Sequence, residues 1–163
     1  MVHRWLQRIA EDKAQGWNVE RVKSLQSRVA QDIGMSGLPL SELQMAVDRV
    51  LSGLINTLDD PRGQWILGPH MESQSEHPVT SRRGTSIRRF VVDCYFREKD
   101  DSLSIVDYKT SHHEGSNVEA FLDRERDRYL VQFQAYSDVM SGGSANCSLY
   151  FPLHRGWRQW GEK

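Results

Sequence analysis

Apolar side chains in the first sixty residues recur every three or four positions, the spacing that gathers them on one face of an α-helix. The pattern predicts an opening helix whose inner face carries Trp5, Leu6 and Ile9. A second helix is expected between Asn18, a residue type that caps helix N-termini, and Gly34.

The most regular helical pattern runs from Ser41 to Leu58, and the sequence Asp59-Asp60-Pro61 stops it. We interpret this helix and the second one as packing elements without a chemical role. Arg62 and Gly63 are then expected to form a turn, followed by a short apolar segment over residues 65–67. A helical part over about residues 1–60 results from this interpretation.

Beyond Glu76 the pattern changes to short runs of β-branched and aromatic residues separated by polar linkers, as is typical of strands. Strands are predicted near residues 76–80, 90–96, 105–109 and 147–151, with a helix over residues 118–140 and a tail containing Trp157 and Trp160 that packs back on the domain. The order is helix, helical insertion, three strands, helix, strand. It predicts a single α/β domain over residues 1–163, with a small mixed β-sheet flanked by α-helices in a core of about residues 61–163.

Asp93, Asp107 and Lys109 are the candidate chemical residues of this core. Alternate side chains of a strand share a face, so Asp107 and Lys109 point the same way. The polar linker over residues 97–102 is short enough for an antiparallel hairpin, and a turn near Lys99 and Asp100 would place Asp93 opposite Val106 or Asp107. Strand-end Asp and Lys residues are commonly just solvated, but a carboxylate among apolar neighbours is costly unless it is paired or bound to a metal.

Composition and charge narrow the classes of function. The net charge is −1 and the pI about 6.6, so no overall basic field indicates nucleic acid, although metal ions can offset phosphate repulsion locally. The two cysteines fit a reducing cytoplasm and exclude a four-cysteine zinc or iron–sulfur site from this chain alone. No apolar run approaches the ~20 residues of a membrane span, and neither a signal peptide nor a Walker phosphate-binding motif is present.

Two further clusters have two interpretations each. Arg82, Arg83, Arg88 and Arg89 are able to contact phosphate, but such a run is more often a solvated face. The pair at residues 112–113 is two adjacent histidines, and we interpret it as a flexible, solvent-facing pair rather than a metal site.

Taken together, the motifs resemble those of the RecB-type branch of the PD-(D/E)XK, restriction-endonuclease-like, nucleases. They are especially similar to the C-terminal nuclease domain of AddA and related UvrD-like helicase–nucleases. The resemblance spans nearly the whole chain and is carried by residues 3–6, Asp93, residues 106–111, Arg128-Tyr129, Gln132 with Tyr136, residues 149–153 and residues 156–158.

This resemblance implies a restriction-endonuclease-like core and a Mg²⁺- or Mn²⁺-dependent deoxyribonuclease, an exonuclease in this branch. It implies that His3, Asp93, Asp107 and the backbone carbonyl of Tyr108 bind the metal. Lys109 would orient the attacking water or stabilise the charged phosphorane, and Gln132 and Tyr136 would line the site and help position Lys109 or the DNA strand. Oxygen and imidazole ligands suit either ion.

The partners implied are DNA, the helicase portion of a parent chain and an AddB- or RecC-like subunit, in double-strand break repair. Two departures matter: the glycine-containing stretch that precedes the histidine in this branch is missing, and so is the helicase portion. Two alternatives therefore stay open. One is a non-catalytic nuclease-fold module that scaffolds a helicase complex or guides DNA, and the other is a stand-alone restriction-like endonuclease.

Overall fold

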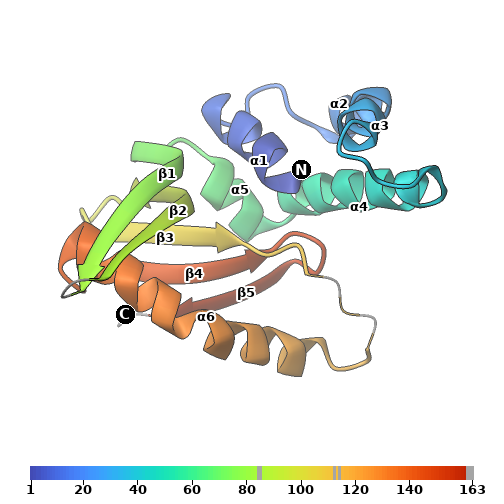
Figure 1. Ribbon diagram of the computed structural model, residues 1–163. Helices are drawn as coiled ribbons and strands as arrows, with labels where there is room; N and C mark the ends of the chain where they lie inside the picture. The colour runs from blue at the N-terminus through green and yellow to red at the C-terminus, as the bar shows by residue number, and fades with distance from the viewer. Residues whose placement is uncertain (84–85, 112, 114, 161–163) are drawn as a thin grey trace. The chain divides into compact units, whose positions relative to one another are not determined.

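The computed structural model describes residues 1–83, 86–111, 113 and 115–160 (Figure 1). The chain divides into two compact units. A helical unit consists of Met1–Gly68 with Pro152–Arg155, and a sheet unit consists of Pro69–Phe151 with Gly156–Lys163. The division falls at Gly68, after the last helix that precedes the strands.

The helical unit follows the apolar spacing of the sequence. Its helices are α1 (Val2–Glu11), α2 (Val19–Ser24), α3 (Gln26–Gly34), α4 (Leu40–Asp59) and α5 (Pro61–Leu67). Trp5, Leu6 and Ile9 are buried on α1, as predicted. The expected second helix is interrupted at Leu25 and forms α2 and α3, but the Asn18 side chain caps it by accepting a hydrogen bond from the Arg21 amide at 2.8 Å.

Helix α5 corrects the expected turn at Arg62 and Gly63. Pro61 does end α4, but it also occupies the first turn of α5, where a missing amide hydrogen costs nothing. Gly63 lies inside α5 because a Cβ atom there would be 2.1 Å from the Thr57 carbonyl oxygen. The glycine permits the close approach of α5 to the end of α4 and does not mark a turn.

In the described part of the sheet unit, five strands form one mixed sheet in the order β1-β2-β3-β4-β5. The strands are β1 (Met71–Arg83), β2 (Ser86–Arg97), β3 (Leu103–Tyr108), β4 (Asn146–Phe151) and β5 (Gly156–Trp160). Neighbouring strands are antiparallel except β3 and β4, which are parallel and are connected through helix α6 (Val118–Ser141). The predicted α/β fold with a small mixed sheet is confirmed.

The C-terminal tail packs back on the domain, as predicted, and Trp160 contacts the core. It does so as a strand, β5, which pairs with β4 through Leu149 opposite Arg158 and Tyr150 opposite Trp157. Helix α6 packs on the sheet through Leu122, Phe133 and Tyr136, in one core with buried residues of the strands such as Ile105 and Leu149. The sheet and α6 thus form the layers that position the candidate site (Figure 1).

Within the described ranges, no helix combines the length and the apolar character that crossing a bilayer requires.

Candidate functional site

The hairpin of β2 and β3 sets the two acidic residues opposite each other. Cys94 pairs with Val106, and the register runs without a shift to Arg97 opposite Leu103. Continuing the register by one residue places Asp93 opposite Asp107. The turn is closed by a hydrogen bond from the Glu98 amide to the Ser102 carbonyl, at 2.9 Å, so it lies where the sequence predicted it.

Asp107 and Lys109 lie on the face of β3 that turns toward α6. Ile105, two residues earlier, belongs to the core formed with α6, and alternation carries Asp107 and Lys109 to the same side. Only 3% of Asp107 is exposed, and the Lys109 ammonium forms an ion pair with its Oδ2 atom. The predicted shared face is confirmed, and the lysine provides the charge partner that a buried carboxylate requires.

Asp93 is fixed by the backbone of the neighbouring strand. Its Oδ2 atom accepts a hydrogen bond from the Tyr108 amide at 2.7 Å. The Tyr108 side chain itself is buried on the opposite face of β3, away from Asp107. This bond holds the Asp93 carboxylate beside the residue that follows Asp107, so both carboxylates converge at one end of the hairpin.

The two carboxylates require a nearby positive charge if both are to be ionised. Burial, and after it the charge of Asp93, raise the pKa of Asp107 from 3.8 to about 7, while Lys109 acts in the lowering direction. A carboxylate held this close to a second one ionises fully only when positive charge balances the pair. The oxygen donors of Asp93 and Asp107 therefore fit a hard divalent cation such as Mg²⁺ or Mn²⁺.

Helix α6 brings three aromatic and amide side chains to the same place. The Lys109 Nζ atom lies 3.9 Å from the centre of the Tyr129 ring, a cation–π contact. Gln132 donates a hydrogen bond to the Tyr136 hydroxyl, which in turn donates to the Val91 carbonyl at 3.2 Å. Burial and then the charge of Asp107 raise the pKa of Tyr136, so this tyrosine keeps its proton beside the carboxylates.

Glu125 also belongs to this region, and sequence reasoning missed it, whereas its partner Ser111 lies in the segment 106–111 that carries the resemblance. Glu125 is buried on α6, where Ser111 donates to its Oε2 atom at 3.3 Å and the Arg128 guanidinium lies 3.5 Å from its Oε1 atom. A signal was present in the sequence, because Glu125 precedes Tyr129 by four residues and so shares its helix face. The bond from Ser111 ties the segment after Lys109 to α6.

His3 and the Tyr108 carbonyl stay predictions as metal ligands. His3 lies in α1 of the helical unit, whereas both acidic residues lie in the sheet unit. Among the residues that the structure describes, no three or more His, Cys, Asp or Glu side chains form a ready metal site.

The histidine pair behaves differently from its prediction. His112 lies outside the described residues. The His113 ring stacks on Phe121, with 4.8 Å between ring centres and 5° between ring planes, so His113 is half-buried rather than solvent-facing.

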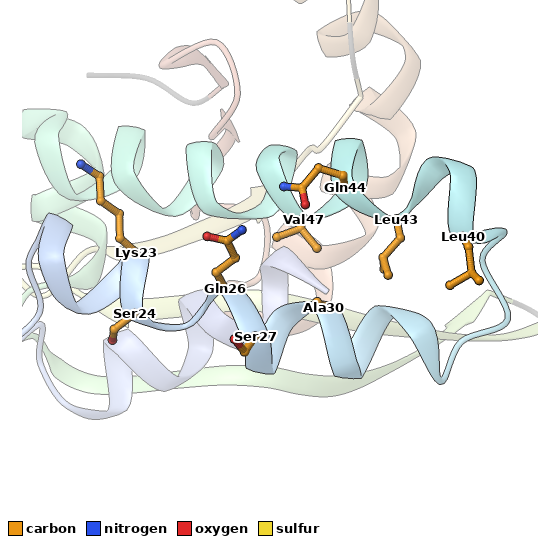
Figure 2. A pocket seen from close by; sticks show the side chains of 9 residues that line it. All are labelled: Lys23, Ser24, Gln26, Ser27, Ala30, Leu40, Leu43, Gln44 and Val47. Carbon is orange, nitrogen blue, oxygen red and sulfur yellow. The ribbon is translucent and has the colours of Figure 1, made fainter.

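The helical unit holds a separate pocket of about 660 Å³ between the α2–α3 segment and α4 (Figure 2). Its lining carries no acidic or histidine side chain and none of the predicted site residues. The lining residues are Lys23, Ser24, Gln26, Ser27, Ala30, Leu40, Leu43, Gln44 and Val47.

Comparisons with known proteins give little further detail. No family model matches the sequence. No curated protein matches it either. Among solved structures, the chain is similar to protein VC1899 from Vibrio cholerae, with a TM-score of 0.38 and 14% sequence identity. The similarity covers 93% of this chain and 45% of that protein, so the chain spans less than half of that protein's length.

Proposed function

We propose that this chain is a metal-dependent deoxyribonuclease domain of the PD-(D/E)XK, restriction-endonuclease-like, class. The observation that carries the proposal is the convergence of Asp93, Asp107 and Lys109 at one end of the β2–β3 hairpin. The order of three strands, a helix and a strand in one mixed sheet supports the proposal, because it matches the order that the sequence pattern predicts and is compatible with the core that the resemblance implies.

Asp93 and Asp107 would hold the divalent ion, with His3 and the Tyr108 carbonyl proposed as further ligands. When bound, such an ion polarises a phosphate and makes a water molecule acidic enough to act as a nucleophile. Asp107 contributes a buried carboxylate whose pKa, raised to about 7 by burial and by Asp93, favours the nearby binding of positive charge. The Tyr108 amide keeps the Asp93 carboxylate oriented by its 2.7 Å hydrogen bond.

Lys109 would act on the reacting phosphate. Its ammonium carries three hydrogen-bond donors, and Asp107 and the Tyr129 ring hold it in place. A donor held in place before the reaction stabilises charge that develops in the transition state without first reorganising. We therefore assign it to orienting the attacking water or to stabilising the phosphorane oxygens.

Gln132 and Tyr136 would position this machinery from α6. The bond from Gln132 to the Tyr136 hydroxyl, and the bond from Tyr136 to the Val91 carbonyl, tie α6 to β2 two residues before Asp93. Because the pKa of Tyr136 is raised by burial, the hydroxyl remains a neutral donor at physiological pH. It therefore adds no negative charge to a site that must accept phosphate.

The wider context of the domain is part of the same proposal. We propose that it serves an ATP-dependent helicase–nuclease of the RecB/AddA type in double-strand break repair, as an exonuclease with an AddB- or RecC-like partner. A cytoplasmic location is supported by Cys94 and Cys147, which are both free and buried.

A nuclease assay on linear and circular DNA, with and without Mg²⁺, tests the activity. Loss of linear DNA only when Mg²⁺ is present supports the proposed exonuclease, whereas cleavage of the circle as well indicates an endonuclease. The decisive preparation is the parent helicase–nuclease, in which every DNA contact is present. Absence of metal-dependent cleavage there would favour the scaffold alternative.

A further inference from the structure

A positive patch of the sheet unit lies on the hairpin of β1 and β2, outside the residues to which a catalytic role was assigned. We define the arginine arm as residues 80–82 of β1 and the residues 87–89 with which they pair. The next pair, Val79 and Phe90, already belongs to the core formed with α6. From His77 to Val92 the sequence contains four arginines and no acidic residue. Arg82, Arg88 and Arg89 are exposed in the structure.

The arginine arm is a two-stranded ribbon rather than part of the wider sheet. Strand β3 pairs with β2 only from Cys94 onward, so the arm residues of β2 have β1 as their one strand partner in the described structure. The hairpin forms one end of the sheet (Figure 1). A ribbon of two strands, about 5 Å apart, is narrow enough to enter the major groove of duplex DNA, about 12 Å wide.

The arginines occupy both faces of this ribbon. Arg89 pairs with Thr80 and Arg82 with Ile87, which places Arg82 and Arg89 diagonally on one face. Arg88 pairs with Ser81 and, by alternation, lies on the other face. A single strand of nucleic acid would contact only one face of the ribbon. The two walls of a DNA groove would contact both faces.

Two other arginines of the sheet unit have close acidic partners. Arg97 pairs with Glu72 at 2.7 Å, and Arg158 pairs with Glu119 at 2.6 Å and with Asp123 at 2.7 Å. Within the described residues, Arg88 and Arg89 form no ion pair. Guanidinium groups left open in this way are the usual donors to phosphate oxygens, which they bind in a bidentate manner.

The arginine arm is also connected to the candidate site. The Phe90 ring contacts the Tyr136 ring edge-on, with 5.5 Å between centres, and the Tyr136 hydroxyl bonds to the next residue, Val91. Arg89 precedes Asp93 by four residues, about 13 Å along a strand. A duplex held by the arm therefore lies within reach of the carboxylates.

We propose that the arginine arm enters the major groove of duplex DNA and contacts phosphates of both strands, with Arg88 on one wall and Arg89 on the other. This inference rests on the proposed function for its choice of DNA as the polyanion.

Fluorescence anisotropy of the full chain with a labelled short duplex, in EDTA so that no cleavage occurs, tests the proposal. The variants are Arg88→Gln, Arg89→Gln and the double variant. The matched control is Lys13→Gln with Arg49→Gln, which also removes two exposed positive charges. Each lost phosphate contact should weaken binding roughly tenfold at about 0.1 M salt and reduce the slope of log affinity against log salt by about 0.9.

The expected result is a slope reduced by about one contact in each single variant and by about two in the double variant. The control should keep the wild-type slope, and Arg88→Lys with Arg89→Lys should largely retain it because the charge remains. The proposal is overturned if the double variant matches the control, if only one face contributes, if a single strand of the same length binds more tightly than the duplex, or if the wild-type chain does not bind the duplex.

Cleavage is measured separately by adding Mg²⁺ to the same preparations. Wild-type binding that depends on the arginine arm without any cleavage would overturn the proposed nuclease and leave the arm proposal intact. Metal-dependent cleavage with unchanged affinity in the double variant would do the reverse.

Discussion

The Lys109 ammonium lies 3.9 Å from the centre of the Tyr129 ring, on the side of β3 where it also pairs with Asp107. The carboxylate comes from β3, which ends one residue before the lysine, and the ring comes from α6 after the chain has crossed to the next layer. Two elements in different layers therefore fix the position of one charge. The contacts of Lys109 with Asp107 and with Tyr129 can therefore be removed separately by mutation.

Lys109→Ala should remove the charge that acts on the transition state and leave the two carboxylates in place. Turnover of linear DNA should fall about 10²–10³-fold, on the order of 3–4 kcal/mol, with DNA binding nearly unchanged. Turnover and anisotropy in the parent helicase–nuclease measure the two effects. Wild-type turnover by this variant, with Mg²⁺ still required, would show that Lys109 is not catalytic.

Tyr129→Leu should weaken the hold on Lys109, because the aromatic face is lost while much of the apolar volume remains. A partly desolvated cation–π contact contributes about 0.5–2 kcal/mol, so turnover should fall roughly 2- to 30-fold. Tyr129→Phe keeps the face and serves as the control, with turnover near that of the wild type. Equal losses in both variants would point to the hydroxyl instead of the ring.

Asp107 should make the stability of the metal-free chain depend on pH. Its folded-state pKa is about 7, raised from 3.8 mainly by burial, so the folded state binds this proton more tightly than the unfolded chain. The free energy of unfolding should therefore decrease as pH rises from about 4 to about 7, by on the order of a few kcal/mol, and then level off. Urea unfolding in EDTA at several pH values measures this decrease.

The matched variant for that experiment is Asp107→Asn, which resembles the protonated side chain in shape. It should lose this part of the pH dependence, be more stable than the wild type above pH 7, and lose metal-dependent cleavage. A pH dependence identical to that of the wild type would mean that another group titrates.

Mn²⁺ binding should follow the carboxylates. Crystals soaked in Mn²⁺ are expected to show anomalous density at Asp93 and Asp107, with His3 as the proposed third side-chain ligand, and Asp107→Ala crystals should lose it. Density only at the pair over residues 112–113, or none at high Mn²⁺, would refute the assignment.

Local chemistry explains which parts of the fold could be predicted. The register of Asp93 and Asp107 follows from a short polar turn, and the length of α6 follows from its apolar spacing. Glu125 was missed because a glutamate on a charged helix gives no sign of burial until Ser111 and Arg128 are seen beside it. The position of His3 depends on tertiary packing between distant segments, which a single sequence does not encode in any local pattern.

The position of Gly63 inside a helix and the strand pairing of residues 156–160 escaped prediction for the same reason. Gly63 was interpreted as a turn residue, but its role depends on the Thr57 carbonyl, which would lie 2.1 Å from an added Cβ atom. Residues 156–160 lack the strict alternation of a strand, and their pairing is determined by β4. In both cases a neighbour in space outweighs the local preference of the segment.

The short segment Pro152–Arg155, between β4 and β5, determines whether the two units can be separated as intact fragments. It belongs to the helical unit, where the Pro152 and Leu153 carbonyls accept hydrogen bonds from Asn56 at 3.1 and 3.3 Å. The chain therefore passes from one unit to the other at residue 68, again after residue 151, and once more before residue 156. No single cut yields both units whole, so a fragment that begins at residue 69 carries four residues whose partners have been deleted. A gene fusion at residue 68 would need to replace the loop over residues 152–155 as well. The helices and the sheet are therefore expected to be inherited together.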